Sequence, residues 1–239
     1  MDSSTTAPVL DCAEQAARPA AFRAACDAIG HGGLIVLPTD TVYGIAADAR
    51  DSRAVAALLA AKGRGRNMPP PVLVADPADL DGIVQDVPPA ARVLMDAFWP
   101  GALTIVLPTH PDLTWDLGDL VGTVAVRIPD LQVTRDLLRA TGPLAVSSAN
   151  RTGQPPARTA QEARDQLGDR VRLYLDAGPA PGGVASTVID FVVDAQGAPA
   201  PRVLRQGAID AASLRRVVSN ATGGVPEDQA DGAGGEGRA

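Results

Sequence analysis

The sequence predicts an α/β fold built as a single domain, on three observations. Short apolar runs alternate with helical patterns from about residue 19 to residue 219, and neither an internal repeat nor a linker interrupts them. Hydrophobic residues make up 46% of the 239 residues, which is enough to form a buried core. Aromatic residues make up only 3%, so this core must consist mainly of Val, Leu, Ile and Ala.

The predicted strands are short apolar runs. The first, residues 34–37, is apolar throughout, which is typical of a strand buried on both faces. Pro38 ends it, because proline has no N–H to donate to a sheet. The other predicted strands are 72–75, 103–107, 123–128, 144–147, 173–175, 187–193 and 202–204.

The predicted helices begin at residues that suit a helix N-terminus. Pro89 suits the first helical position, where a missing N–H costs nothing. Thr159 and Glu162 form a T-x-x-E capping box. The remaining caps are Asp51 or Ser52, Asp130 and Asp210. Helices are expected at 20–29, 52–61, 78–84, 89–98, 130–142, 159–167 and 210–218.

The two ends of the chain differ from this pattern. Residues 1–18 are polar and weakly patterned, so we expect a loose lead-in. Residues 220–239 are rich in Gly, Asp and Glu, and such a segment buries too little apolar surface to order itself. We therefore expect an α/β domain over residues 19–219 and a disordered acidic tail over residues 220–239.

Composition excludes several classes of function. A formal charge of −7 and a pI near 4.8 argue against a broad basic face for nucleic acid. Two cysteines are too few for a disulfide framework, and with only two histidines the sequence argues against a zinc site or a Ser-His-Asp triad. The N-terminus lacks a signal sequence, and no apolar run could span a bilayer, so a cytoplasmic protein is expected.

Hydrogen-bonding side chains follow the strand at 34–37 directly. Thr39, Asp40, Thr41 and Tyr43 come next, and Gly44 follows them. Polar side chains at the end of a buried strand suit a ligand crevice. The same residues also suit a plain turn, in which Asp and Thr bond to nearby backbone groups. The sequence leaves both interpretations open.

Arg127 lies inside an apolar run, TVAVRIP. On a strand it shares one face with Thr123 and Ala125, because side chains alternate with a period of two. A guanidinium among apolar neighbours needs an anionic partner. That partner is either a bound anion or an Asp of the protein.

The loop after the second helix carries three cations, Lys62, Arg64 and Arg66, separated by glycines. Glycines let backbone N–H groups approach an anion, so the loop suits a phosphate site as well as a solvated surface. No Walker or dinucleotide fingerprint occurs, and no activated nucleophile is evident. The chemistry that remains is positioning and charge stabilisation, as in transfer at phosphorus.

Seven motifs together resemble one family, the YrdC-like threonylcarbamoyl-AMP synthases, in its short form without a further domain. The resemblance covers about residues 20–210 and implies a twisted mixed β-sheet with flanking helices, similar to dihydroxybutanone-phosphate synthase. The motifs, in the family's order, are PTDTVYG (38–44), KGR (62–64), FWPGALTIVL (98–107), VAVRIP (124–129), SSAN (147–150), STVID (186–190) and LRQG (204–207).

The resemblance implies a nucleotidyltransferase that makes threonylcarbamoyl-AMP and pyrophosphate from L-threonine, bicarbonate and ATP. The product serves threonylcarbamoyladenosine modification of tRNAs that read ANN codons. Mg²⁺ is expected to accompany ATP without a dedicated protein metal site. A tRNA-modifying transferase complex is the expected downstream partner, direct contact with tRNA is expected to be weak or indirect, and no membrane is involved.

Site residues are implied by the same motifs. Thr39, Arg127 and Ser186 are expected to bind L-threonine, with Arg127 on its carboxylate. Lys62 and Arg64 are the expected catalytic residues. The residues expected to bind ATP are Lys62, Arg64, Arg66, Thr123, Ser148, Asn150 and Arg205.

The basic loop departs from the family pattern K-x-R-P-x-x-N-P-L, since it reads KGRGRNMPPPVL. Alignment without a gap from Pro71 backwards puts Arg66 rather than Arg64 in the arginine position. It also puts Pro70 at the family's asparagine and Ala75 at a histidine found in some members. Which arginine serves, and what replaces the other two side chains, stay open.

Three other functions remain as alternatives. One is an RNA-binding module of the same fold, which the basic loop would favour and the charge of −7 disfavours. Another is carbamoyl transfer in hydrogenase maturation, although those proteins usually carry cysteine-rich zinc segments. The third is a paralogue of the synthases with a different substrate.

Overall fold

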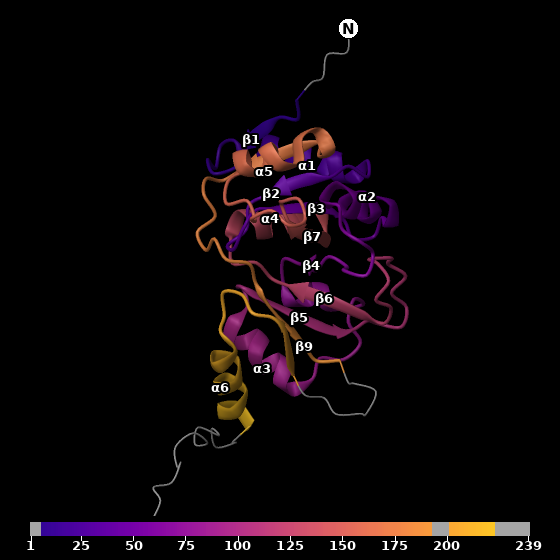
Figure 1. Ribbon diagram of the computed structural model, residues 1–239, viewed down its shortest axis with the longest axis vertical. Helices are drawn as coiled ribbons and strands as arrows, with labels where there is room; N and C mark the ends of the chain where they lie inside the picture. Colours follow the sequence, from indigo (N-terminus) through magenta and orange to yellow (C-terminus); the bar gives the residue numbers. More distant parts are fainter. Residues whose placement is uncertain (1–5, 193–200, 223–239) are drawn as a thin grey trace, which may run out of the picture.

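Strands from the whole length of the chain form one mixed sheet, which runs through the molecule (Figure 1). The computed structural model describes residues 6–192 and 201–222. Across the sheet the strands are β1 (Val9–Asp11), β8 (Leu173–Asp176), β2 (Ile35–Leu37), β3 (Gly44–Asp48), β7 (Leu144–Ser148), β4 (Val72–Leu73), β6 (Thr123–Arg127), β5 (Leu103–Pro108), β9 (Thr187–Asp190) and β10 (Arg202–Arg205).

The sheet is mixed, as expected. Parallel pairs join β1 to β8, β2 to β8, β4 to β6 and β5 to β9, and the other neighbours are antiparallel. Helices and short 3-10 turns flank the sheet. They are α1 (Arg18–Gly30), α2 (Ser52–Lys62), α3 (Pro89–Phe98), α4 (Gln132–Thr141), α5 (Ala160–Leu167) and α6 (Ala211–Thr222), with 3-10 turns η1 (Pro77–Leu80) and η2 (Gly168–Arg170).

The half of the sheet around β2 is covered on both faces. Val36 packs with α2 and α5, whereas Ile35 and Leu37 on either side of it pack with α1 and α4. Alternate side chains of a strand point to opposite faces, so a strand between two helical layers must be apolar at every position. All three residues of β2 are fully buried, which confirms the prediction.

The half of the sheet around β5 has helices on one face. Leu103, Ile105 and Leu107 pack into a core with α3 and α6, which lie side by side in Figure 1. Thr104 and Val106, between them in sequence, point the other way and line a cavity. The cavity lies on this second face.

Several predicted helix ends are confirmed. The Asp51 side chain accepts hydrogen bonds from the N–H groups of Arg53 and Ala54 and caps α2. Pro89 is the first residue of α3. Thr159 caps α5 by accepting from the N–H of Glu162, as the capping box predicts.

Other predicted ends are wrong. Leu131, not Asp130, holds the cap position of α4, and no side chain bonds there. The helix expected at 78–84 is the single turn η1, because Gly82 follows it with φ of +79°, outside the helical region. Helix α6 continues to Thr222, so residues 220–222 do not belong to the expected tail. Residues 223–239 of that tail, and Val193 of the strand expected at 187–193, lie outside the described residues.

Two strands were not expected. β1 lies in the segment predicted to be a loose lead-in, and β3 lies in the stretch after Tyr43 for which no strand was predicted. Val9 pairs with Tyr174 and Ile45 with Ser147, so each strand is stabilised by a partner far along the chain. No helix in the part of the chain that the structure describes is long and apolar enough to cross a membrane.

Candidate functional site

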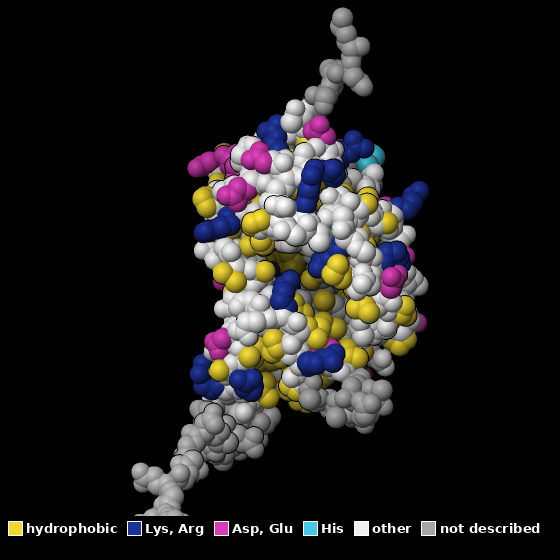
Figure 2. Space-filling view, viewed as in Figure 1, with side chains coloured by type: hydrophobic (Ala, Val, Ile, Leu, Met, Phe, Trp, Pro, Cys, Tyr) yellow, Lys and Arg dark blue, Asp and Glu magenta, His cyan; other side chains and the backbone are white. Residues whose placement is uncertain are grey.

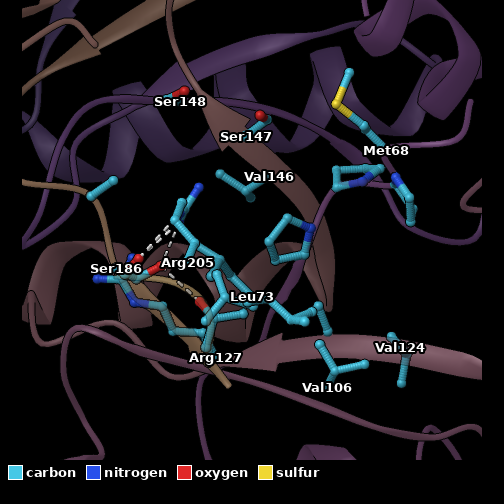
Figure 3. A pocket seen from close by; sticks show the side chains of 18 of the residues that line it. Met68, Leu73, Val106, Val124, Arg127, Val146, Ser147, Ser148, Ser186 and Arg205 are labelled. Carbon is cyan, nitrogen blue, oxygen red and sulfur yellow. Dashed lines mark hydrogen bonds between the residues drawn. The ribbon is translucent and has the colours of Figure 1, made fainter. Parts of the chain in front are cut away.

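A cavity of about 630 Å³ opens on the second face of the β5 half of the sheet, and β7, β6, β5 and β9 contribute to its lining. Figure 2 shows a hollow in the middle of this face, with hydrophobic side chains inside it and Lys or Arg side chains at its edge. Leu73, Val106, Val124 and Val146 form part of its apolar surface (Figure 3). Apolar walls with a few converging polar groups are typical of a small-molecule site.

The stretch between β2 and β3 forms one end of the cavity. The Thr39 hydroxyl donates to the Val42 carbonyl at 2.6 Å and lies 3.0 Å from the Thr41 hydroxyl. These local bonds are those of a turn, yet both threonine side chains line the cavity. The turn is therefore confirmed, and it presents both threonine side chains to the cavity.

Arg127 reaches this end from β6. Its Nη2 donates to Asp40 at 2.6 Å, its Nη1 to the Thr41 hydroxyl at 3.0 Å, and its Nε to the Gly101 carbonyl at 2.8 Å. Burial lowers the pKa of the guanidinium, and Asp40 acts in the opposite sense. The structural ion pair considered for Arg127 is thus present, while two of its five N–H groups are not used by these bonds.

Thr123 and Ala125 lie on the same strand as Arg127, and all three line the cavity. Val126, between Ala125 and Arg127, instead packs into the core on the other face of the sheet, so the alternation predicted for this strand is confirmed there. The residue expected at the nucleotide and the residue expected at the threonine carboxylate therefore share one face of β6.

Ser186 and Arg205 meet beside Arg127 (Figure 3). Arg205 donates from Nη2 to the Ser186 carbonyl at 2.8 Å and to its hydroxyl at 3.2 Å. The Ser186 hydroxyl also lies 2.8 Å from that of Thr104. Partial burial lowers the pKa of Arg205, and the positive charges of Arg64 and Arg127 lower it further. Like charges gathered in this way favour an anionic ligand.

The structure distinguishes the two arginines of the basic loop. Arg64 lines the cavity and donates to the Ser147 hydroxyl at 3.0 Å, and burial lowers its pKa. Arg66 lies outside the cavity lining, where it pairs with Asp116 at 2.7 Å and Asp119 at 3.0 Å. Arg64 is therefore the arginine that the fold directs to the site.

Asn67 lines the cavity too, next to Pro70, whereas Ala75 does not. Sequence reasoning did not single out Asn67, although an amide side chain close to the family's asparagine position was a usable signal. It supplies an amide to this wall of the cavity, where Pro70 itself offers no side-chain hydrogen bond.

Lys62 lies behind the cavity wall and is only 4% exposed. Its ammonium donates to the Ser148 carbonyl, to the Asn150 carbonyl at 2.8 Å and to the Asn150 side-chain oxygen at 3.3 Å. These bonds use all three N–H groups of the ammonium. Burial, followed by the charge of Arg64, lowers its pKa to about 8. Lys62 and Asn150 do not appear among the cavity-lining residues, but Ser148 does.

Most of the chain matches the model of a known protein family. Residues 27–207 match the family model of the Sua5/YciO/YrdC domain, which is described as "Telomere recombination". The chain belongs to this family. The resemblance drawn from the seven motifs is thus confirmed.

Curated relatives in the Sua5/YciO/YrdC family cover most of the chain. A Mycobacterium tuberculosis protein provisionally named threonylcarbamoyl-AMP synthase is 51% identical over 209 residues, which is 87% of this chain and 94% of the relative. The threonylcarbamoyl-AMP synthase of Bacillus subtilis is 37% identical over 187 residues, or 77% of this chain and 53% of the relative.

Solved structures of the Sua5/YciO/YrdC family have the same fold. Pyrococcus abyssi Sua5, crystallised with L-threonine, superposes with a TM-score of 0.81 at 30% identity, covering 93% of this chain and 65% of that one. Escherichia coli YciO has a TM-score of 0.70 at 24% identity, covering 85% of this chain and 95% of that one. The predicted α/β architecture is confirmed.

The residues that the sequence motifs place at the site fall into two groups. Lys62, Asn150 and Arg66 lie behind or outside the cavity. The others line it together: Thr39, Arg64, Thr123, Arg127, Ser148, Ser186 and Arg205. Among the described residues, no group of three or more His, Cys, Asp or Glu side chains could hold a metal ion.

Proposed function

We propose that this protein is an L-threonylcarbamoyladenylate synthase, a nucleotidyltransferase that uses L-threonine, bicarbonate and ATP. The observation that carries the proposal is the convergence of Arg64, Arg127 and Arg205 on one cavity. Both ATP and threonine bear negative groups, and arginine binds carboxylates and phosphates with parallel hydrogen bonds. The names of the relatives and the threonine-bound Sua5 support the same activity.

In this proposal the substrates divide between the two ends of the cavity. Arg127 holds the threonine carboxylate through its unused N–H groups, with the hydroxyls of Thr39 and Ser186 nearby. Thr123 and Ser148 contact the nucleotide. Arg64 and Arg205 neutralise the phosphates, and Mg²⁺ arrives bound to ATP and adds countercharge there.

The chemistry requires no protein nucleophile. Threonine and bicarbonate combine to N-carboxythreonine with loss of water. A carboxylate oxygen of this carbamate attacks the α-phosphorus, the bond to the β-phosphate oxygen breaks, and pyrophosphate leaves with the electron pair. The protein orients the reacting atoms and supplies positive charge where the leaving group forms.

The product would pass to a tRNA-modifying transferase complex that acts on tRNAs reading ANN codons. The alternative of an RNA-binding module has less support, because the three arginines lie inside a cavity instead of on a broad basic face. The net charge of −7 also disfavours RNA binding.

The proposal is tested by measuring pyrophosphate release from ATP and Mg²⁺, with threonine and bicarbonate each present or omitted. We expect release only when both are present, and an adenylate product of the mass of threonylcarbamoyl-AMP. Release without threonine, or none in the complete mixture, would refute the synthase assignment.

The two loop arginines provide a matched pair of variants. Arg64→Ala is expected to raise the KM for ATP by about tenfold or more, because it removes a charged donor from the cavity. Arg66→Ala removes only an exposed ion pair and should leave the KM close to that of the wild type. Steady-state kinetics with ATP as the varied substrate measures the KM of both variants. A larger rise in Arg66→Ala than in Arg64→Ala would place Arg66 at the phosphates.

A further inference from the structure

Thr104 is the polar residue of β5 that faces the cavity. It is 1% exposed, and its neighbours Leu103 and Ile105 point into the core on the other face of the sheet. The parallel ladder with β9 places it opposite Val188, directly after Ser186 and Thr187 in the chain. Its hydroxyl oxygen consequently lies 2.8 Å from that of Ser186.

The hydrogen bonds around Ser186 leave one hydroxyl proton unused, and it is that of Ser186 when Thr104 is the donor of the pair. Arg205 can only donate, and it donates to the Ser186 hydroxyl oxygen at 3.2 Å. Between the two hydroxyls, one O–H donates to the other oxygen. One proton of the pair is therefore left, and within the described residues no protein acceptor takes it. Since both side chains line the cavity, this proton is available to an oxygen of a ligand.

We propose that Thr104 is a positioning residue, whose hydroxyl fixes the orientation of the Ser186 hydroxyl for an oxygen of L-threonine. This inference rests on the proposed function, in which Ser186 contacts that substrate. Without the Thr104 hydroxyl, only the bond from Arg205 at 3.2 Å constrains the Ser186 hydroxyl, so its donor direction is less fixed. The effect should therefore fall on threonine and spare ATP.

Thr104→Val tests the inference, because valine keeps the β-branched shape and removes only the hydroxyl. We expect the threonine KM, from pyrophosphate release, and the threonine Kd, from calorimetry without ATP, to rise about three- to tenfold, as for the loss of one hydrogen bond. The KM for ATP should not change. Thr104→Ser should restore wild-type values.

A distant threonine provides the control. The Thr141 hydroxyl donates to the Leu137 carbonyl within α4, away from the cavity. Thr141→Val should leave all three substrate KM values unchanged. Thermal unfolding of each variant shows whether it is folded. If the valine variant is destabilised, Thr104→Ser is compared with Thr104→Ala instead, because these two variants differ only by the hydroxyl group.

Three results would overturn the positioning role: an unchanged threonine KM in Thr104→Val, an equal loss in the serine variant, or an equal rise in the KM for ATP or bicarbonate. These three results differ from the result expected if the proposed function itself is wrong. In that case the wild-type protein itself would neither require threonine for pyrophosphate release nor bind it.

Discussion

Lys62→Met is expected to lower the free energy of unfolding by about 2–4 kcal/mol and to weaken ATP binding at least about tenfold. The substitution leaves the Asn150 carbonyl and the Asn150 side-chain oxygen without the lysine donor, while the Ser148 carbonyl keeps only its bond from the Asn150 N–H. Leaving a buried polar group without a partner costs about 1–3 kcal/mol. Lys62 bonds to the segment from Ser148 to Asn150, and Ser148 lines the cavity. Loss of these bonds should therefore displace Ser148 and weaken ATP binding.

Urea unfolding and calorimetry with a non-hydrolysable ATP analogue measure these two quantities. Arg53→Met is the matched control, an exposed basic residue on the same helix, and should change neither. The comparison also separates two roles for Lys62. A variant of wild-type stability that has lost only its ATP affinity would show that the ammonium contacts phosphate directly.

Arg127→Ala should have the largest effect on threonine. We expect the KM for threonine to rise by about a hundredfold, the usual order for losing a buried charge-assisted pair. The variant should also lose about 3–5 kcal/mol of stability, because Asp40 is then left buried without its cation. Steady-state kinetics and urea unfolding give the two values.

A double variant separates the ligand contact from the structural ion pair. Arg127→Met combined with Asp40→Asn removes both charges, and removing both partners of a buried pair is often neutral for stability. We therefore expect most of the stability to return while threonine binding does not. A double variant that binds threonine like the wild type would refute the carboxylate assignment.

The local sequence pattern predicted a strand or helix correctly wherever the surrounding layers determine which of its residues are buried. The strand at 34–37 could be predicted because helices cover both its faces. β1 could not, because it is only 3 residues long, and β3 could not, because Gly and Ala disfavour strands. Ala46 and Ala47 lie in a central strand only because β2 and β7 pair with it on either side.

Strand periodicity also predicted part of the site, namely the common face of Thr123, Ala125 and Arg127. It could not separate Arg64 from Arg66, since the carboxylates of Asp116 and Asp119 that hold Arg66 outside come from a distant loop. Nor could it show that Lys62 bonds to the end of β7, since that contact joins segments 86 residues apart.

The cavity is lined by segments spread between Thr39 and Arg205, and Arg205 is the last residue of β10, the last strand of the described chain to be synthesised. A nascent chain on the ribosome can assemble the half around β2 only when β8 has emerged, and it has no complete anion site until β10 has followed. Translation must therefore pass residue 205 before the arginine cluster exists. A message cut short anywhere before that codon yields a polypeptide without the three-arginine cluster, on which the proposed function depends.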